Sequence, residues 1–307
     1  MYSKDQLEQW LEQSKTLCSS GKTADYIPAL AKANPHTLGI TLFPIGSPPI
    51  SCGDESAIFT LQSISKVFTL LLALMDHGEE YVFERVGMEP TGDDFNSMLK
   101  LELVPPGKPF NPLINAGAIT VTSMIKGESL IQKWERIAAF ISTFLGEDEV
   151  RFNQEVYSSE KNTANRNRSL AYFLKDVGVL EGDVEENLDL YFKHCAIEVD
   201  CRQLARMGMI LAGNGIDPVT SAQIVPKRYV QIAKTFMLTC GMYNASGEFA
   251  IKAGIPAKSG VSGGILAVVP GKLGIGVIGP ALNEKGNSIA GVHLLQKIAS
   301  AWELSMF

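Results

Sequence analysis

Residues 61–67 read Leu61-Gln62-Ser63-Ile64-Ser65-Lys66-Val67. Here an extended segment gives way to the apolar run of residues 67–75, which is typical of a helix buried in a core. Residues three apart lie on one face of a helix, so the Lys66 amine can reach the Ser63 hydroxyl. The spacing predicts a serine nucleophile with a lysine as its base.

This chemistry requires an uncharged lysine, because only a neutral amine can take the proton of a serine hydroxyl. The pKa of a lysine in water is about 10.4, and lowering it to near neutrality takes about 4 kcal/mol of differential interaction. Burial against the apolar residues that follow Lys66 can supply this energy. The start of the helix also places the Ser63 N–H where it can stabilise an oxyanion.

A Ser-x-x-Lys pair alone is a weak signal, since a structural serine and a solvated lysine give the same pattern. A second element strengthens it. The segment 256–265 contains Lys258-Ser259-Gly260 and reads as a strand edge whose glycines permit close approach of a ligand. In penicillin-recognising serine enzymes a Lys-Thr/Ser-Gly strand lies beside the Ser-x-x-Lys helix. The residues alone therefore indicate a serine acyl-transfer enzyme, with Ser63, Lys66 and Lys258 named and the substrate open.

Composition indicates a globular enzyme that acts on small molecules. The 307 residues are 46% hydrophobic and 20% charged, which suits one or two domains with a large core. The net charge of −6 disfavours electrostatic binding to nucleic acid or to an anionic membrane. No apolar run reaches the roughly 20 residues that span a bilayer, and the first residues lack the apolar core of a signal peptide. We expect a cytoplasmic protein with no membrane partner.

The cysteines and histidines give no framework for a disulfide or a metal. The five cysteines contain no Cys-x-x-Cys pair, so we expect reduced thiols, no metal and no cofactor. His194 beside Cys195 allows a cysteine nucleophile in principle. This alternative is weaker than the serine–lysine interpretation because Cys195 has no accompanying oxyanion signal.

A glycine pattern supports a third possibility, a nucleotide-dependent oxidoreductase. Gly274, Gly276 and Gly279 match the spacing of a dinucleotide-binding fingerprint. The context contradicts it, because such a turn should open a helix within a βαβ unit, whereas Pro280 and a further turn follow here. We interpret the glycines as part of an antiparallel strand pressed against neighbouring backbone.

The pattern along the chain predicts an α/β (α+β) fold in which an antiparallel sheet is flanked by helices and interrupted by an inserted helical domain. Residues 1–66 and 245–307 should form the discontinuous sheet domain and residues 67–244 the helical domain, with the active site between them. The expected helices cover residues 4–18, 129–144, 169–177, 200–211 and 289–304, besides the helix after Ser63. The expected strands lie at residues 37–43, 49–52, near Phe249, at 265–269 and at 274–278.

The chain resembles the serine-dependent glutaminases over nearly its whole length. The matching stretches are Ala24-Asp25-Tyr26-Ile27-Pro28, Gln62-Ser63-Ile64-Ser65-Lys66, Asn111-Pro112-Leu113-Ile114-Asn115-Ala116-Gly117-Ala118, Ser159-Glu160, Arg166-Asn167-Arg168, Asp189-Leu190-Tyr191-Phe192, Gly241-Met242-Tyr243 and Lys258-Ser259-Gly260-Val261. Their order and intervals are family-like. The resemblance implies a β-lactamase/transpeptidase-like fold and hydrolysis of L-glutamine to L-glutamate and ammonia.

The resemblance also implies roles for individual residues. Ser63 would form a γ-glutamyl ester with Lys66 as base, and the Ser63 and Val261 N–H groups would hold the oxyanion. Tyr243 or Tyr26 would relay the proton to the departing ammonia. The implied substrate-binding residues are Gln62, Ser63, Asn115, Glu160, Asn167, Tyr191, Tyr243 and Val261, supported by Lys258, Ser259 and Gly260.

Each of these polar residues also has a structural interpretation. Tyr191 and Tyr243 could fill the core, Asn115 and Asn167 could cap turns, and Glu160 could be an exposed charge. Two other functions remain open: a β-lactamase or peptidoglycan peptidase with the same geometry, and a sensor that binds glutamine without turnover. Glutaminases of this kind are generally homo-oligomers, so we expect self-association.

Overall fold

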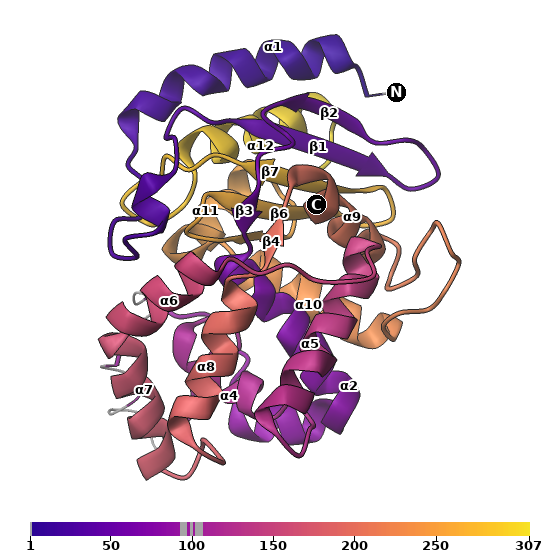
Figure 1. The fold of residues 1–307 in the computed structure, drawn as a ribbon. Helices are drawn as coiled ribbons and strands as arrows, with labels where there is room; N and C mark the ends of the chain where they lie inside the picture. Colours follow the sequence, from indigo (N-terminus) through magenta and orange to yellow (C-terminus); the bar gives the residue numbers. More distant parts are fainter. Residues whose placement is uncertain (1, 93–96, 99–100, 102–106) are drawn as a thin grey trace.

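The computed structural model describes residues 2–92, 97–98, 101 and 107–307, and its centre is a five-stranded antiparallel sheet. The strand order is β2-β1-β7-β6-β5, so segments from the two ends of the chain lie side by side (Figure 1). β1 pairs with β7 along its whole length, with Thr41 opposite Gly276. The strands are β1 (Gly39–Pro44), β2 (Ile50–Gly53), β5 (Ala257–Ser259), β6 (Gly264–Val269) and β7 (Leu273–Ile278).

Helices surround this sheet and fill the middle of the chain. Those of the described residues are α1 (Lys4–Lys15), α2 (Ser65–Arg85), α4 (Asn115–Ser123), α5 (Leu130–Leu145), α6 (Gln154–Thr163), α7 (Asn165–Asp176), α8 (Val184–Cys195), α9 (Cys201–Ala212), α10 (Lys227–Cys240), α11 (Ser246–Lys252) and α12 (Ile289–Ala301). Short 3₁₀ turns include η3 (Gln62–Ile64) and η4 (Tyr243–Ala245). Each helix predicted from the sequence is present, with ends that differ by a few residues.

The two faces of the sheet are covered by different helices. α1 and α12 lie on one face, where their apolar side chains pack against Ile40 and Leu42 of β1. α9 lies on the other face and contacts β1, β6 and β7. Because side chains alternate along a strand, Leu266 and Val268 of β6 point to the α9 side and join the core of the helical part.

α9 approaches the sheet closely because β7 presents glycines to it. A Cβ on Gly274 would lie 2.1 Å from the Met209 nitrogen, and one on Gly276 would lie 2.3 Å from the Cys201 carbonyl oxygen. Both distances are shorter than any van der Waals contact. The glycines therefore serve helix–strand packing in an antiparallel sheet, as predicted, and the dinucleotide-binding alternative is wrong.

Ser63 stands where the sheet meets the helices. β3 (Phe59–Thr60) pairs with β4 (Glu198–Val199) in a separate two-stranded sheet, and η3 and then α2 follow directly. The Leu61 N–H continues this pairing by donating to the Ile197 carbonyl, at 2.8 Å. α2 then runs through the core of the helical part, where Phe68 packs edge-on against Phe144. The connection is thus fixed on both sides of Ser63.

The predicted antiparallel sheet flanked by helices is confirmed, but one predicted strand is wrong. Residues Ser246–Lys252 around Phe249 form the short helix α11. Phe249 is buried in the core, while Ile251 is 89% exposed. A helix of seven residues contains too few turns for its period to show in the sequence, so the apolar run resembled a strand.

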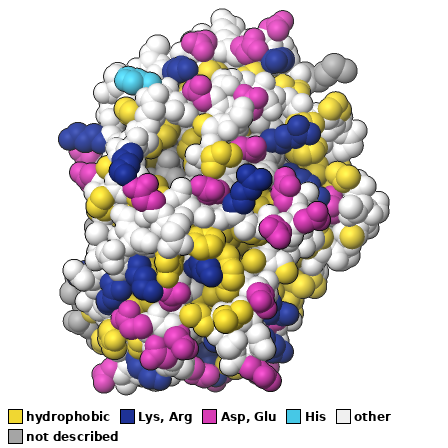
Figure 2. All heavy atoms as spheres, in the orientation of Figure 1, with side chains coloured by type: hydrophobic (Ala, Val, Ile, Leu, Met, Phe, Trp, Pro, Cys, Tyr) yellow, Lys and Arg dark blue, Asp and Glu magenta, His cyan; other side chains and the backbone are white. Residues whose placement is uncertain are grey.

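The predicted domain limits stay a prediction. α9 lies between residues 67 and 244 yet packs on the sheet, and α10 contacts α11 and β5 as well as α2, whereas α2 and α4–α8 pack mainly against one another (Figure 1). Among the described helices, none has the length and apolar character needed to cross a membrane. Figure 2 shows acidic and basic side chains interspersed over one face of the molecule.

Candidate active site

Ser63 is held in a tight turn with a strained neighbour. Gln62 has a φ of +48°, a left-handed conformation that a residue with a side chain adopts only at a cost. The Ser65 hydroxyl donates to the Gln62 carbonyl at 2.7 Å and closes the turn. Ser63 itself is buried, and it lies near enough to Tyr243 to lower the pKa of that tyrosine, against the larger and opposite effect of burial.

Lys66 lies one helical turn after Ser63 and is fully buried. Its amine donates to the Asn115 side-chain oxygen at 2.6 Å and to the Leu113 carbonyl at 3.4 Å. Burial lowers the pKa of Lys66 to about 8, although the nearby Cys195 and Glu160 act in the opposite direction. The amine is thus shielded from water, and about half of it is neutral near pH 8.

A small cavity of about 90 Å³ collects most of the predicted site residues. Of those residues, Tyr26, Gln62, Ser63, Asn115, Glu160, Asn167, Tyr191 and Val261 line it. Tyr26 and Val261 also line a wider cavity of about 700 Å³, and Tyr243 lines that cavity but not the small one. Because Tyr26 and Val261 line both cavities, the small cavity borders the wider one.

Three helices contribute amide and hydroxyl groups to one connected network. The Asn115 amide donates to the Asn167 side-chain oxygen at 2.8 Å, which joins α4 to α7. The Tyr191 hydroxyl of α8 donates to the Asn115 side-chain oxygen at 3.4 Å. That oxygen also accepts from Lys66, so the groups that line the cavity are connected to the base.

Glu160 of α6 provides a buried carboxylate at this cavity. Burial raises the pKa of Glu160 to about 7, opposed by the charge of Lys66 and by a hydrogen bond from Gln62. Its Oε2 atom makes no hydrogen bond among the described residues. A buried carboxylate oxygen with no partner is suited to a substrate ammonium group.

The Lys258-Ser259-Gly260 segment packs against the turn that contains Ser63 and does not line the small cavity. A Cβ on Gly260 would lie 2.6 Å from the Leu61 carbonyl oxygen, so the glycine lets β5 approach the Ser63 turn. The fully buried Lys258 amine donates to the Ser259 carbonyl at 2.6 Å and lies 4.4 Å from the centre of the Tyr243 ring. Burial, and then the charge of Lys66, lowers the pKa of Lys258 well below its usual value. These contacts make the strand a support for Tyr243.

Tyr243 and Tyr26 approach the site from opposite parts of the chain. Tyr243 has a φ of +52°, so the site contains a second strained residue besides Gln62. The Ser246 hydroxyl donates to the Tyr243 carbonyl at 2.9 Å and fixes this turn. Tyr26 lines both cavities and is 53% exposed, which places it at the border between the site and solvent.

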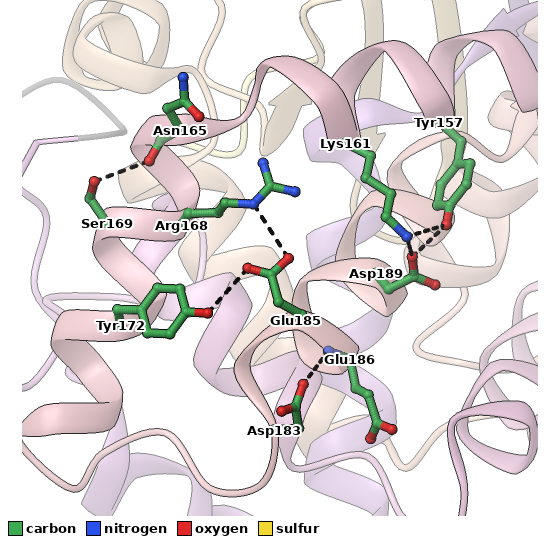
Figure 3. Close-up of polar contacts among 10 residues, drawn as sticks. All are labelled: Tyr157, Lys161, Asn165, Arg168, Ser169, Tyr172, Asp183, Glu185, Glu186 and Asp189. Atoms are coloured by element: carbon green, nitrogen blue, oxygen red, sulfur yellow. Dashed lines mark hydrogen bonds and ion pairs between the residues drawn. The ribbon is translucent and has the colours of Figure 1, made fainter.

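Ion pairs on the outside join the helices that carry the site residues (Figure 3). Asp189 of α8 accepts from Lys161 and from the Tyr157 hydroxyl, both of α6. Arg168 of α7 pairs with Glu185 of α8 at 3.3 Å. We call Tyr157, Lys161 and Asp189 the α6–α8 clamp. It lies next in sequence to Glu160 and close to Tyr191, so it fixes the spacing between them.

The cysteine alternative is contradicted by its surroundings. Burial raises the pKa of the Cys195 thiol far above its usual value, which leaves no thiolate for attack. The neighbouring His194 bonds to Ser65 and Thr122 instead of activating the thiol. In the part of the chain that the structure describes, no group of three or more His, Cys, Asp or Glu side chains could hold a metal ion.

Some residues at the cavity were not predicted from the sequence. Ile27, Thr163, Ala164, Arg166 and Cys195 line it as well. Arg166 is adjacent to Asn167, so its position in the same motif was the only available signal. Hydrophobic and small residues at a cavity wall give no pattern of their own.

An antiparallel sheet flanked by helices, with a serine and a buried lysine at their junction, is typical of hydrolases that have the β-lactamase-like fold. The glutaminase family model matches residues 21–307. The glutaminase of Alkaliphilus metalliredigens is 56% identical over 303 residues, covering 99% of each chain, and that of Geobacillus thermodenitrificans is 53% identical over 307 residues. The chain belongs to the glutaminase family.

Solved structures agree with this assignment. A probable glutaminase from Bacillus subtilis in complex with 6-diazo-5-oxo-L-norleucine superposes with a TM-score of 0.91 at 45% identity, covering 98% of this chain and 96% of that one. A Bacillus glutaminase in the presence of 4.3 M NaCl gives a TM-score of 0.93 at 45% identity, with 99% of both chains covered. The predicted family and fold are confirmed.

Proposed function

We propose that this glutaminase hydrolyses L-glutamine to L-glutamate and ammonia through a covalent ester on Ser63. The observation that carries the proposal is the buried Lys66 amine, whose lowered pKa makes it a base one helical turn from the serine. Family membership at more than 50% identity supplies the substrate. No cofactor takes part in the proposed steps.

Substrate binding would use the polar groups of the small cavity. The α-ammonium of glutamine would pair with Glu160, whose Oε2 atom makes no other hydrogen bond among the described residues. The remaining side-chain N–H groups of Asn115 and Asn167 would donate to the α-carboxylate, and the single Tyr191 hydroxyl hydrogen would turn to it from the Asn115 oxygen. Since these groups are buried, an analogue that leaves them unpaired is rejected strongly. The carboxamide would then point to Ser63 and the N–H groups of Ser63 and Val261.

In the first step, the Ser63 oxygen attacks the carboxamide carbon and its proton passes to Lys66. The carbon–nitrogen bond breaks, and the proton returns to the nitrogen through the Tyr243 hydroxyl, so ammonia leaves. In the second step, water attacks the ester and gives its proton to Lys66. That proton returns to the Ser63 oxygen as glutamate is released.

The test is release of glutamate and ammonia from L-glutamine and from L-asparagine. We expect many turnovers with glutamine, far fewer with the shorter asparagine, and none for Ser63→Ala, while the exposed control Ser19→Ala keeps native activity. 6-Diazo-5-oxo-L-norleucine should label the peptide that contains Ser63. Hydrolysis of a chromogenic β-lactam without ammonia release would favour the peptidase alternative, and ammonia limited to one equivalent per chain would favour a sensor.

Tyr243 has its own test within this mechanism. If its hydroxyl carries the proton to the departing nitrogen, Tyr243→Phe should lose turnover while binding glutamine with near-native affinity. Equal activity of the two proteins would assign the transfer to Lys66 alone.

The cellular setting is proposed on two further features. The four cysteines Cys18, Cys52, Cys195 and Cys201 are buried free thiols, which supports a reducing compartment such as the cytoplasm, testable by cell fractionation. The resemblance to glutaminases, which are generally homo-oligomers, supports self-association. A molar mass by light scattering equal to that of one chain would contradict the second proposal.

A further inference from the structure

His194 is a fully buried histidine that the proposed reaction does not use. Its Nδ1 atom lies 2.8 Å from the Ser65 hydroxyl, and its Nε2 atom lies 3.0 Å from the Thr122 hydroxyl. Burial, with a contribution from the charge of Lys66, lowers the pKa of His194 to about 3. A pKa this low keeps the ring neutral near neutral pH.

The three helices that meet at this ring each carry site residues. Ser65 is the first residue of α2 and stands between Ser63 and Lys66. Thr122 belongs to α4, which begins at Asn115, and His194 itself belongs to α8 with Tyr191. The imidazole thus links the nucleophile segment to two walls of the substrate cavity.

The link reaches Ser63 through the strained turn. The Ser65 hydroxyl that contacts His194 also donates to the Gln62 carbonyl, at 2.7 Å. Gln62 has a left-handed backbone, which persists in a residue with a side chain only where its surroundings hold it. Because Gln62 directly precedes Ser63, release of this turn would change the direction of the nucleophile.

The number of protons decides which nitrogen must donate. A neutral imidazole has one N–H, and each hydroxyl has one hydrogen to give. If Nδ1 carries the proton, it donates to Ser65, and Ser65 stays free to donate to Gln62. If Nε2 carries it, Ser65 must donate to Nδ1 and loses the Gln62 carbonyl. If Nδ1 carries the proton, Thr122 must donate to Nε2 and loses its own bond to the Ala118 carbonyl. This loss is tolerable, because a helix such as α4 does not need a side-chain bond to the carbonyl four residues earlier.

We propose that His194 is a positioning residue for the Ser63 reaction, in the tautomer whose Nδ1–H donates to Ser65 and thereby keeps the Ser65 hydroxyl on the Gln62 carbonyl. Its effect is on the orientation of the nucleophile, and it touches neither the substrate nor the reacting atoms. The inference rests on the proposed role of Ser63.

Two substitutions test the hydrogen bonds of the two ring nitrogens separately. His194→Asn retains a polar atom near the Nδ1 position, which can still donate to Ser65. His194→Gln retains one near the Nε2 position, which can reach Thr122 only. Both remove ring volume, so they share the cost of a cavity. For labelling by saturating 6-diazo-5-oxo-L-norleucine, we expect a rate constant about tenfold lower for His194→Gln and within about threefold of native for His194→Asn, below the roughly 100-fold cost of a 1 Å misplacement.

A Ser65→Ala background tests whether His194 acts through the hydroxyl. Ser65→Ala alone should slow labelling about tenfold, and adding His194→Gln should slow it no further. The concentration of reagent that gives half the maximal rate should stay within about twofold of native in every variant. Partial unfolding would reduce the fraction of protein labelled without reproducing this pattern. Equal rates for the two His194 variants, or additive losses in the double variant, would overturn the proposal.

A measurement on the native protein tests the proposal independently, because it does not require any substituted protein to fold. The ¹⁵N chemical shifts of a neutral histidine report which ring nitrogen carries the proton. At pH 5 the His194 ring should still be neutral and protonated at Nδ1, and a ring protonated at Nε2 would overturn the proposal. Failure to label Ser63 in the native protein would refute the proposed function instead, so the two failures are distinguishable.

Discussion

At the scale of single residues, burial shifts the pKa values of the ionisable groups at the site. Lys66 is stabilised in its neutral form and Glu160 in its protonated form, because each loses contact with water. The two groups also lie within range of each other, and each opposes the effect of burial on the other. The pH dependence of kcat should therefore follow Lys66, and the pH dependence of KM should follow Glu160.

The first prediction concerns this pH dependence. At saturating glutamine, kcat should rise about tenfold per pH unit below pH 8 and level off above it, because only neutral Lys66 can take the Ser63 proton. KM should rise below about pH 7, where Glu160 becomes protonated and loses its charge for the substrate ammonium. Steady-state ammonia release from pH 5 to 10 measures both. A kcat that still rises about tenfold between pH 9 and pH 10 would show an unshifted lysine.

How far the site could be predicted also depends on individual residues. Ser63, Lys66 and Lys258 were found from local spacing, since a helical turn and a strand motif bring their own partners close. Glu160, Asn167 and Tyr191 come from three different helices, and only the family resemblance grouped them. His194 gave no usable signal, because its partners Ser65 and Thr122 are far from it in sequence.

At the scale of secondary-structure elements, two contacts position the parts of the chain around the site. One is the close packing of α9 on β7, and the other is the α6–α8 clamp. The helices and most strands could be predicted because long segments show their period. α11 was predicted wrongly and the pairing of β3 with β4 was not foreseen, since a seven-residue helix and two-residue strands are defined by tertiary contacts.

We expect Gly274→Ala to destabilise the fold by at least about 3 kcal/mol. The added carbon would lie 2.1 Å from the Met209 nitrogen and 2.2 Å from the Ala205 carbonyl oxygen, and backbone atoms cannot move aside locally. Urea unfolding measures the change. Gly247→Ala is the matched control, because no atom lies within 4 Å of its added carbon and it lies in α11. The control should be neutral or stabilised by about 0.5–1 kcal/mol, and equal losses would contradict the packing argument.

For the α6–α8 clamp, Asp189→Asn removes the negative charge that Lys161 and Tyr157 contact. Glu160 and Tyr191 should then be held less firmly, so we expect KM for glutamine to rise about two- to fivefold with kcat within twofold of native. The effect is modest because the Lys161 side chain is 42% exposed and screened by water. Lys252→Gln breaks an exposed pair with Glu248 and should leave KM unchanged. An unaltered KM for Asp189→Asn would separate the clamp from binding.

At the scale of the whole molecule, the site joins parts of the chain that lie on opposite sides of a junction. Tyr26 and Val261 come from the sheet side, whereas Glu160 and Asn167 come from helices of the middle segment. We propose that these are two structural parts with limits near residues 66 and 245. A bound substrate would hold them together.

Glutamine should consequently stabilise the entire fold when it cannot be hydrolysed. For Ser63→Ala at a glutamine concentration 100 times Kd, we expect the free energy of unfolding to increase by about 2.7 kcal/mol in a single transition. L-Asparagine at the same concentration should give a much smaller increase. Calorimetry or urea unfolding provides the measurement, and equal effects of the two amino acids would contradict the proposed fit of the cavity.

The pairing of β1 with β7 has a consequence for synthesis on the ribosome. β1 (Gly39–Pro44) emerges early, but its partner (Leu273–Ile278) is translated close to the end of the chain. At about 5–20 residues per second, the early strand waits on the order of ten seconds or longer with one edge uncovered. The nascent chain is thus exposed to aggregation and to chaperones throughout this delay, and it gains a complete sheet beside Ser63 only when nearly all of it has been made.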